Sequence, residues 1–215
     1  MEMSIGGYRS VQGYRATINS YQYGDAVAIS RIALLNKELL IAEEFRNKSI
    51  ALKFNVESVL WDKNASFFKV LPRKGSPPST PLYPLVDVRE LHGYTPWAFN
   101  LPSPDKSIAW SEVLDSKGGF LARYGLTTAE QRHANFTLAY DTHECQWNGP
   151  SWPFATSMTL TALANLLNNY QQNIIKKRSY LDLVQIYAKS QYRIREKDGK
   201  KVPWIDENLH PYTGR

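Results

Sequence analysis

Cysteine is almost absent from this 215-residue chain, which has a single one at Cys145. One cysteine excludes an internal disulfide and a thiolate-based metal site. No apolar run approaches the roughly 20 residues of a membrane-spanning helix, and the first residues, MEMSIGGYRS, lack the charged start and apolar core of a signal peptide. We therefore expect no membrane partner and slightly favour the cytoplasm, although sequons at Asn47, Asn64 and Asn135 leave secretion open.

Neither sign of charge dominates the chain, since 26 basic residues face 20 acidic ones and leave a net charge of +6. The basic excess lies late, at Lys176–Arg178 and Arg193–Lys201. Such runs usually belong to solvated helix ends and turns, so we expect no nucleic-acid partner. Aromatic residues are abundant instead, with six Trp and thirteen Tyr. This surplus favours either core filling or a surface that stacks flat ligands such as sugars or bases.

Hydrophobic periodicity predicts four long helices, over about 20–35, 37–60, 152–170 and 179–192. The first two are joined by a couple of residues and should form an antiparallel hairpin. Apolar and small residues surround the third helix on nearly every side, which predicts that it is buried all round. The fourth helix is amphipathic, with Ser179 as a reasonable N-cap.

Residues 71–150 contain most of the prolines and no long periodic segment. Before them, LWDKNASFFKV at 60–70 predicts a turn and a short strand-like run, and brief helices are expected near 87–91 and 107–114. A loop region of this length is normally functional or disordered. Its tryptophans and tyrosines argue against disorder, so we predict an ordered candidate binding surface.

Helix pairs with long aromatic loops at one end are compatible with a double ring of helices that carries its site in the loops. A complete ring of six pairs needs twelve helices. At about 10–14 residues per helix, such a ring exceeds 215 residues. We therefore expect residues 1–215 to be a single incomplete domain, a piece of such a toroid whose edges expose apolar helix faces.

Three segments resemble the six-hairpin glycosidases. ECQWNGPSWPFATSMTLTALANLL, Glu144–Leu167, is similar to their Trp-x-Gly-Pro-x-Trp segment. INSYQYGDAVAISRIALL with the later LWDKNASFFKV resembles their paired helix and following hairpin, and ENLHPYTG, Glu207–Gly214, resembles their C-terminal catalytic segment. The segments resemble in particular those of the mannosylglycerate-hydrolase-like domains, which are akin to glycoside hydrolase family 63 and trehalases.

This resemblance implies a mainly α fold, a partial (α/α)6 toroid with long aromatic loops and a few short strands. The 215 residues would form the C-terminal portion of a glycoside hydrolase catalytic domain. The implied reaction is the inverting hydrolysis of an O-glycosidic bond of an α-linked glucose or mannose type. We expect a carbohydrate substrate and no cofactor.

An inverting glycosidase needs a protonated carboxyl for the leaving oxygen and an ionised carboxylate that activates water on the opposite face. The resemblance implies that Glu207 is the base, with Trp204 and Tyr212 as walls of its pocket, whereas the alternative is a solvent-facing acidic turn. Relatives place the acid in a Gly-x-Asp-x-Ser stretch before the first helix. The local match is MEMS, which has Glu2 in the Asp position and no preceding Gly. The acid is therefore Glu2 or a residue upstream of Met1.

Sugar binding needs flat apolar faces against C–H surfaces and polar groups for hydroxyls. Two loop segments supply such side chains, and the candidates are Trp147, Asn148, Gly149, Trp152, Glu90, Tyr94 and Trp97. Trp152 could equally be the first buried residue of its helix. Arg89 or Arg132 could meet an acidic group on a substrate or pair with a nearby carboxylate.

YDTHEC, at Tyr140–Cys145, groups Asp, His, Glu and Cys but lacks helical i, i+4 spacing and a second cluster nearby. We therefore expect loop bracing there and no metal. Two other functions stay open beside the glycosidase. One is a non-catalytic or degenerate carbohydrate-binding fragment of the same fold that has lost the acid. The other is a helical scaffold whose aromatic loops bind a protein.

Overall fold

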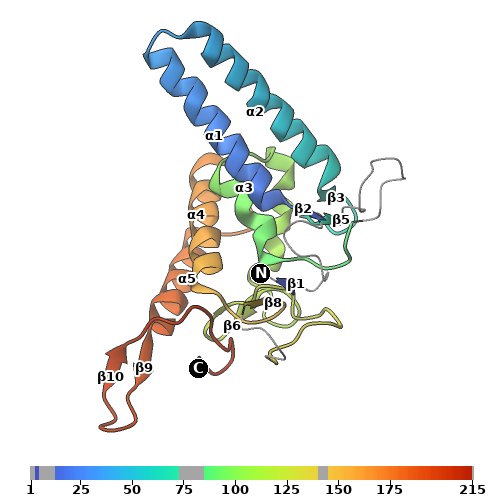
Figure 1. Ribbon diagram of the computed structural model, residues 1–215. Helices are drawn as coiled ribbons and strands as arrows, with labels where there is room; N and C mark the ends of the chain where they lie inside the picture. The colour runs from blue at the N-terminus through green and yellow to red at the C-terminus, as the bar shows by residue number, and fades with distance from the viewer. Residues whose placement is uncertain (1–2, 5–12, 73–84, 140–144, 215) are drawn as a thin grey trace.

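The computed structural model describes residues 3–4, 13–72, 85–139 and 145–214 (Figure 1). Its longer helices are α1 (Ala16–Leu35), α2 (Leu39–Val59), α4 (Pro153–Asn169) and α5 (Lys177–Ser190). Shorter helical turns are α3 (Thr95–Ala98) and the 3₁₀ helices η1 (Leu91–Tyr94) and η2 (Pro104–Glu112). All four predicted long helices are confirmed, within a few residues at each end. The two predicted brief helices are shifted to η1 and η2.

The strands are short and occur in pairs. β1 (Met3–Ser4) pairs in parallel with β8 (Gln146–Trp147). The antiparallel pairs are β2 (Gly13–Tyr14) with β5 (Leu71–Pro72), β3 (Trp61–Asp62) with β4 (Phe67–Phe68), β6 (Leu121–Ala122) with β7 (Gly125–Leu126), and β9 (Tyr192–Ile194) with β10 (Lys201–Pro203). The β3–β4 hairpin confirms the turn and strand-like run predicted after the second helix.

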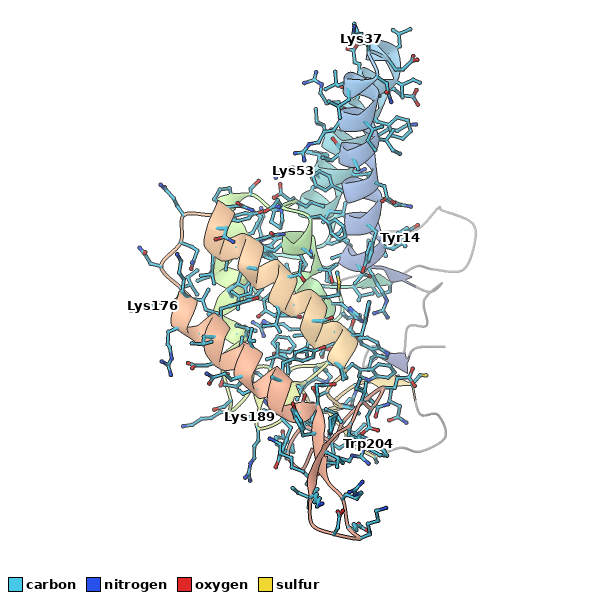
Figure 2. The ribbon with its side chains drawn as sticks, turned by 90° about the vertical axis from the view of Figure 1, so that its left-hand side faces the viewer. Tyr14, Lys37, Lys53, Lys176, Lys189 and Trp204 are labelled. Carbon is cyan, nitrogen blue, oxygen red and sulfur yellow. The ribbon has the colours of Figure 1, made fainter. Side chains whose placement is uncertain are left out.

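Helices α1 and α2 form the predicted antiparallel hairpin, which projects beyond the rest of the described chain (Figure 1). Lys37 lies at its tip (Figure 2) and adopts the left-handed backbone conformation that closes the turn, with φ of 63°. Small residues line the contact between the helices, and the Ser30 hydroxyl donates to the Ala42 carbonyl at 2.7 Å. Small side chains allow this close approach of the two backbones.

The outer faces of this hairpin are apolar and exposed. Its exposed large apolar residues are Ile18, Tyr21, Ile29, Ile32, Leu34, Leu35, Leu39, Leu40, Ile41, Ile50, Phe54 and Val59. In α1 the small residues Ala26 and Ala33 are buried, whereas Ile29 and Ile32 are exposed. The hairpin thus exposes large apolar side chains in this structure.

Helices α4 and α5 correct two predictions. Pro153 opens α4 as its first residue, as expected, but Phe154 is 58% exposed, so this helix is not buried all round. Helix α5 has Lys176 as its N-cap, and Ser179 lies inside its first turn. The cause is Gln172, whose side chain bonds to backbone groups of Ile174 and Ile175 and starts the helix earlier.

The centre of the core is built by loop aromatics. Tyr94, Trp97, Trp110, Phe67 and Phe120 are fully buried. The Tyr94 and Trp110 ring centroids lie 4.3 Å apart, and the Tyr94 hydroxyl donates to the Ala109 carbonyl at 2.9 Å. The described loops between α2 and α4 are therefore ordered, as their aromatic content predicted. In the part of the chain that the structure describes, no helix has the length and apolarity needed to cross a membrane.

Candidate functional site

Three segments that are far apart in the sequence meet at residues 146–151. Strand β1 pairs with β8, so that Ser4 lies opposite Trp147. On the C-terminal side, the Ser151 N–H donates to the Leu209 carbonyl at 2.9 Å, and the Leu209 N–H donates back at 2.8 Å. Figure 1 shows β1, β8 and the C-terminal segment on the side of the molecule away from the α1–α2 hairpin. The fold therefore brings together the three segments singled out for catalysis and sugar binding.

Glu207, the predicted base, lies two residues before this Leu209 bridge and is exposed. It forms no hydrogen bond or ion pair with another residue that the structure describes. Its neighbour Asp206 is held on two sides, because the Trp204 indole N–H donates to it at 2.8 Å and Arg193 forms an ion pair with it. Glu2, the predicted acid, lies outside the described residues.

Trp204 lies near the base of the β9–β10 hairpin (Figure 2). The Arg193 guanidinium sits 4.7 Å from the centre of the Trp204 ring. Arg193, Trp204 and Asp206 therefore form one cluster. The cluster orients the chain that leads to Glu207 and occupies one side of the Trp204 ring.

The Pro-Tyr-Thr-Gly turn is tied to the loop after β6. The Tyr124 N–H donates to the Pro211 carbonyl at 2.9 Å, and the Tyr212 hydroxyl donates to the Gln131 amide oxygen at 2.5 Å. The His210 Nδ1 atom accepts the backbone N–H groups of Tyr212 and Thr213 at 3.3 and 3.2 Å. These bonds fix the conformation of the turn that follows Glu207 in the chain.

Trp147 is the middle ring of a three-ring stack. The His92 ring lies 4.4 Å from it at an angle of 24°, and the Trp152 ring lies 4.5 Å from it at 21°. Two nearly parallel rings at these distances cover both faces of the Trp147 indole. The edge of the indole is buried as well, and its Nε1–H group has no hydrogen-bond partner among the described residues. Trp152 is buried, with its own Nε1–H bonded to the Gln146 carbonyl at 2.8 Å.

Gly149 is required by a close approach within the protein itself. A Cβ atom at this position would lie 2.0 Å from the Thr137 carbonyl oxygen. The Gly149 N–H donates to the Thr128 hydroxyl at 3.1 Å, and the Thr137 N–H donates to the Asn148 carbonyl at 3.1 Å. The Asn148 side-chain oxygen is buried and has no partner among the described residues.

The second predicted sugar-binding segment contains Glu90, Tyr94 and Trp97. One part of it lies in the core and the other lines a polar hollow. Tyr94 and Trp97 are each 0% exposed and belong to the aromatic core, so neither faces a ligand in this structure. Glu90 is buried and pairs with Arg15, whose Nη1 atom lies 3.0 Å from the carboxylate. The reason is the turn at η1, which directs the second half of this segment inward.

Arg15, Glu90 and His92 line a small hollow together with Ala16, Phe68, Lys69, Val70, Val88 and Gly93. Burial, followed by the nearby Arg15 cation, lowers the pKa of His92 to about 4. The His92 ring is therefore neutral at physiological pH. Sequence reasoning did not single out Arg15 or His92, although His92 lies inside the quoted ELHGY segment. Its role depends on contact with Trp147, which local sequence does not encode.

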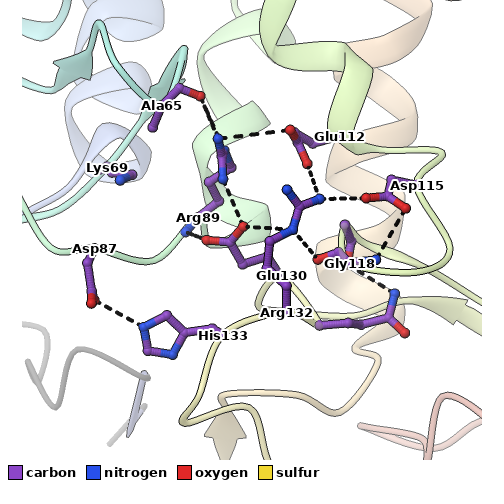
Figure 3. Close-up of polar contacts among 12 residues, drawn as sticks. Ala65, Lys69, Asp87, Arg89, Glu112, Asp115, Gly118, Glu130, Arg132 and His133 are labelled. Atoms are coloured by element: carbon purple, nitrogen blue, oxygen red, sulfur yellow. Dashed lines mark hydrogen bonds and ion pairs between the residues drawn. The ribbon is translucent and has the colours of Figure 1, made fainter.

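Arg89 and Arg132 pair with carboxylates of the protein, which is the second of the two roles considered for them (Figure 3). Arg89 lies 2.9 Å from the buried Glu130 carboxylate and donates twice to the Ala65 carbonyl. Arg132 contacts Glu112 at 2.8 Å and Asp115 at 2.5 Å. This network holds the loop at 127–130, which hydrogen-bonds both to the Glu90 segment and to the segment at 149–151.

No group of three or more metal-binding side chains occurs within the described ranges. Residues 140–144, which make up most of the YDTHEC cluster, lie outside them, while Cys145 is partly buried.

A family model for the mannosylglycerate hydrolase MGH1-like glycoside hydrolase domain matches residues 3–215. The chain belongs to this family. The predicted resemblance to six-hairpin glycosidases is thereby confirmed. A search of curated proteins finds no match to this MGH1-like chain.

Solved structures show the same fold. A sialidase structure shares 40% sequence identity at a TM-score of 0.86, covering 100% of the MGH1-like chain and 18% of its own. The family 63 mannosylglycerate hydrolase from Thermus thermophilus, in complex with glucose, shares 17% identity at a TM-score of 0.59, covering 93% of this chain and 42% of its own. The neutral trehalase Nth1 from Saccharomyces cerevisiae shares 13% identity at a TM-score of 0.56, covering 72% and 28%.

This MGH1-like chain therefore spans less than half the length of each of these structures. Together with the helix pairs described above, the likeness identifies the fold as part of an (α/α)6 toroid, mainly α with long aromatic loops and short strands.

Proposed function

We propose that these residues form the C-terminal portion of a glycoside hydrolase catalytic domain that hydrolyses an O-glycosidic bond with inversion. The observation that carries the proposal is the backbone pairing at 146–151. It joins β1, which directly follows Glu2, to the segment that begins at Glu207. The proposed substrate is a carbohydrate with an α-linked glucose or mannose unit, in line with the sugar-acting enzymes among the similar structures.

Glu207 is the proposed base. Its exposure and lack of a partner among the described residues leave its oxygens accessible to the attacking water. Glu2, or a residue before Met1, is the proposed acid, and an inverting pair would lie about 6.5–9.5 Å apart. The Trp147 Nε1–H and the Asn148 oxygen, which are buried without a partner among the described residues, are the proposed donor and acceptor for sugar hydroxyls once the loops open to a ligand, and Trp204 and Tyr212 are the proposed walls of the pocket.

Asp206 provides a matched control for the base, because it is a neighbouring carboxylate in the same segment. In the intact natural polypeptide, Glu207→Gln should lower the hydrolysis of aryl α-glucosides or α-mannosides about 10²–10⁴-fold and leave sugar binding in place. Asp206→Asn keeps an oxygen that accepts from the Trp204 indole and loses only the charge that pairs with Arg193, so it should lower the activity by less than about tenfold. Proton NMR of the first anomer released tests inversion. Equal losses in the two variants would contradict the assignment of Glu207.

Two outcomes would favour the other functions. If the wild-type polypeptide binds sugar but hydrolyses no glycoside, the carbohydrate-binding alternative holds. If it binds no sugar and instead captures a protein through the aromatic loops, the scaffold alternative holds.

A further inference from the structure

The hollow beside the Trp147 stack has two kinds of wall. Phe68, Val70 and Val88 form an apolar side, while Arg15, Glu90 and His92 form a polar side. It lies where α1 begins, and α1 has no side-chain N-cap. The space holds about one water molecule. A single hydroxyl group is therefore the largest polar group that it accepts.

His92 brings unused hydrogen-bonding capacity to this hollow. Its ring is fixed by stacking on Trp147, and no hydrogen bond joins it to another described residue. Because Arg15 and burial keep the ring neutral, one nitrogen donates and the other accepts. His92 as a whole residue is only partly buried and lines the hollow, so a group in the hollow can reach it.

The charges around the hollow favour a neutral guest. Arg15 and Glu90 are 3.0 Å apart and largely cancel each other, and Lys69 pairs with Asp62 at 3.0 Å. An anion would meet the Glu90 carboxylate, and a cation would meet the Arg15 guanidinium. A hydroxyl group both donates and accepts, which matches a set made of a carboxylate, a guanidinium and a neutral imidazole.

We propose that this hollow is a subsite for one sugar hydroxyl, in which His92 is the residue that determines specificity. The inference rests on the proposed glycosidase function and adds to it a contact outside the resemblance motifs. His92 forms a hydrogen bond with the hydroxyl, and stacking on Trp147 fixes the orientation of the imidazole ring. Arg15 and Glu90 supply the remaining donor and acceptor.

The test compares methyl α-D-glucopyranoside and methyl α-D-mannopyranoside with their monodeoxy analogues, by calorimetric titration of the intact natural polypeptide. One deoxy analogue should bind about threefold to tenfold more weakly, which corresponds to one net hydrogen bond. In His92→Phe, which keeps a ring against Trp147, that difference should vanish while the other analogues keep their order. His92→Gln, which retains a donor and an acceptor, should restore part of it.

If the sugars bind and the deoxy difference persists in His92→Phe, the subsite is refuted while the proposed function stands. If the wild-type polypeptide binds none of these sugars, both are refuted. Because the Phe variant could fold poorly, the wild-type ring is also followed by nitrogen NMR. Sugar should shift the His92 ring signals and leave those of His133, which pairs with Asp87, in place. Unmoved His92 signals during saturable binding would overturn the proposal.

Discussion

Replacing Arg89 by methionine would remove the cation that compensates Glu130 and keep a side chain of similar length. The Glu130 carboxylate is 3% exposed and accepts both the Arg89 backbone N–H, at 2.8 Å, and its guanidinium, at 2.9 Å. In the variant, the nearest remaining cation is Arg132, 3.6 Å from the same carboxylate. Breaking a buried pair costs about 3–5 kcal/mol. We expect a loss of unfolding free energy of about 3 kcal/mol, because Arg132 still compensates part of the charge.

Urea denaturation at neutral pH measures this loss, and Arg178→Met is the matched control. Arg178 pairs with Asp182 at 2.9 Å on the exposed surface of α5, and such a pair contributes about 0.3–0.5 kcal/mol. The double variant Arg89→Met with Glu130→Met should recover much of the loss.

A loss below about 1 kcal/mol in Arg89→Met would refute this reasoning. Normal stability combined with weaker binding of an acidic substrate would instead identify Arg89 as a ligand-binding residue, the first role considered for it. The two roles thus differ in what is lost, stability in one and affinity in the other.

The remaining predictions concern Gly149 and His92. Gly149→Ala should lower the free energy of unfolding by about 3 kcal/mol, because the added Cβ would meet the Thr137 carbonyl oxygen at 2.0 Å. Gly199→Ala is the control, because its Cβ would meet open space and only its φ of +67° is unfavourable, and it should lower the free energy of unfolding by about 1 kcal/mol. Equal losses in thermal melts would argue against the clash at Gly149. The pKa of His92 falls from 6.5 to about 4 on folding, so the unfolded chain holds this proton more tightly and stability is lost as the pH falls through that window. His92→Phe should remove this part of the pH dependence, and an unchanged slope in urea denaturation would contradict it.

The long helices could be predicted because periodicity depends on residues that are close in sequence. Helices α1, α2, α4 and α5 all follow from it, and the Pro153 start of α4 follows from local backbone chemistry. Burial was less predictable. Phe154 is exposed although apolar and small residues surround its helix on nearly every side, because burial depends on which neighbouring elements cover each face.

The candidate site shows the same difference between features that local sequence predicts and features that depend on distant contacts. The segments containing Trp147 and Glu207 could be found from their resemblance to glycosidases, and the Ser151–Leu209 bridge joins them. The covering of Trp147 by His92 and Trp152 could not be found in this way. Neither could the distinction between Asp206, which is held by Arg193, and the exposed Glu207. These features arise from contacts between distant segments.

The rigidity of the site comes from the loops more than from the projecting helices. Each buried aromatic side chain removes about 150–250 Å² from water, and the loops supply Tyr94, Trp97 and Trp110 to the core. The α1–α2 hairpin is joined largely through small residues such as Ala26 and Ala42 and leaves its large apolar side chains exposed. Substitutions in the loop core should therefore disturb the Trp147 stack and the Glu207 segment more than substitutions at the hairpin tip. The order of the site thus depends on the same loop residues that bring its distant segments together.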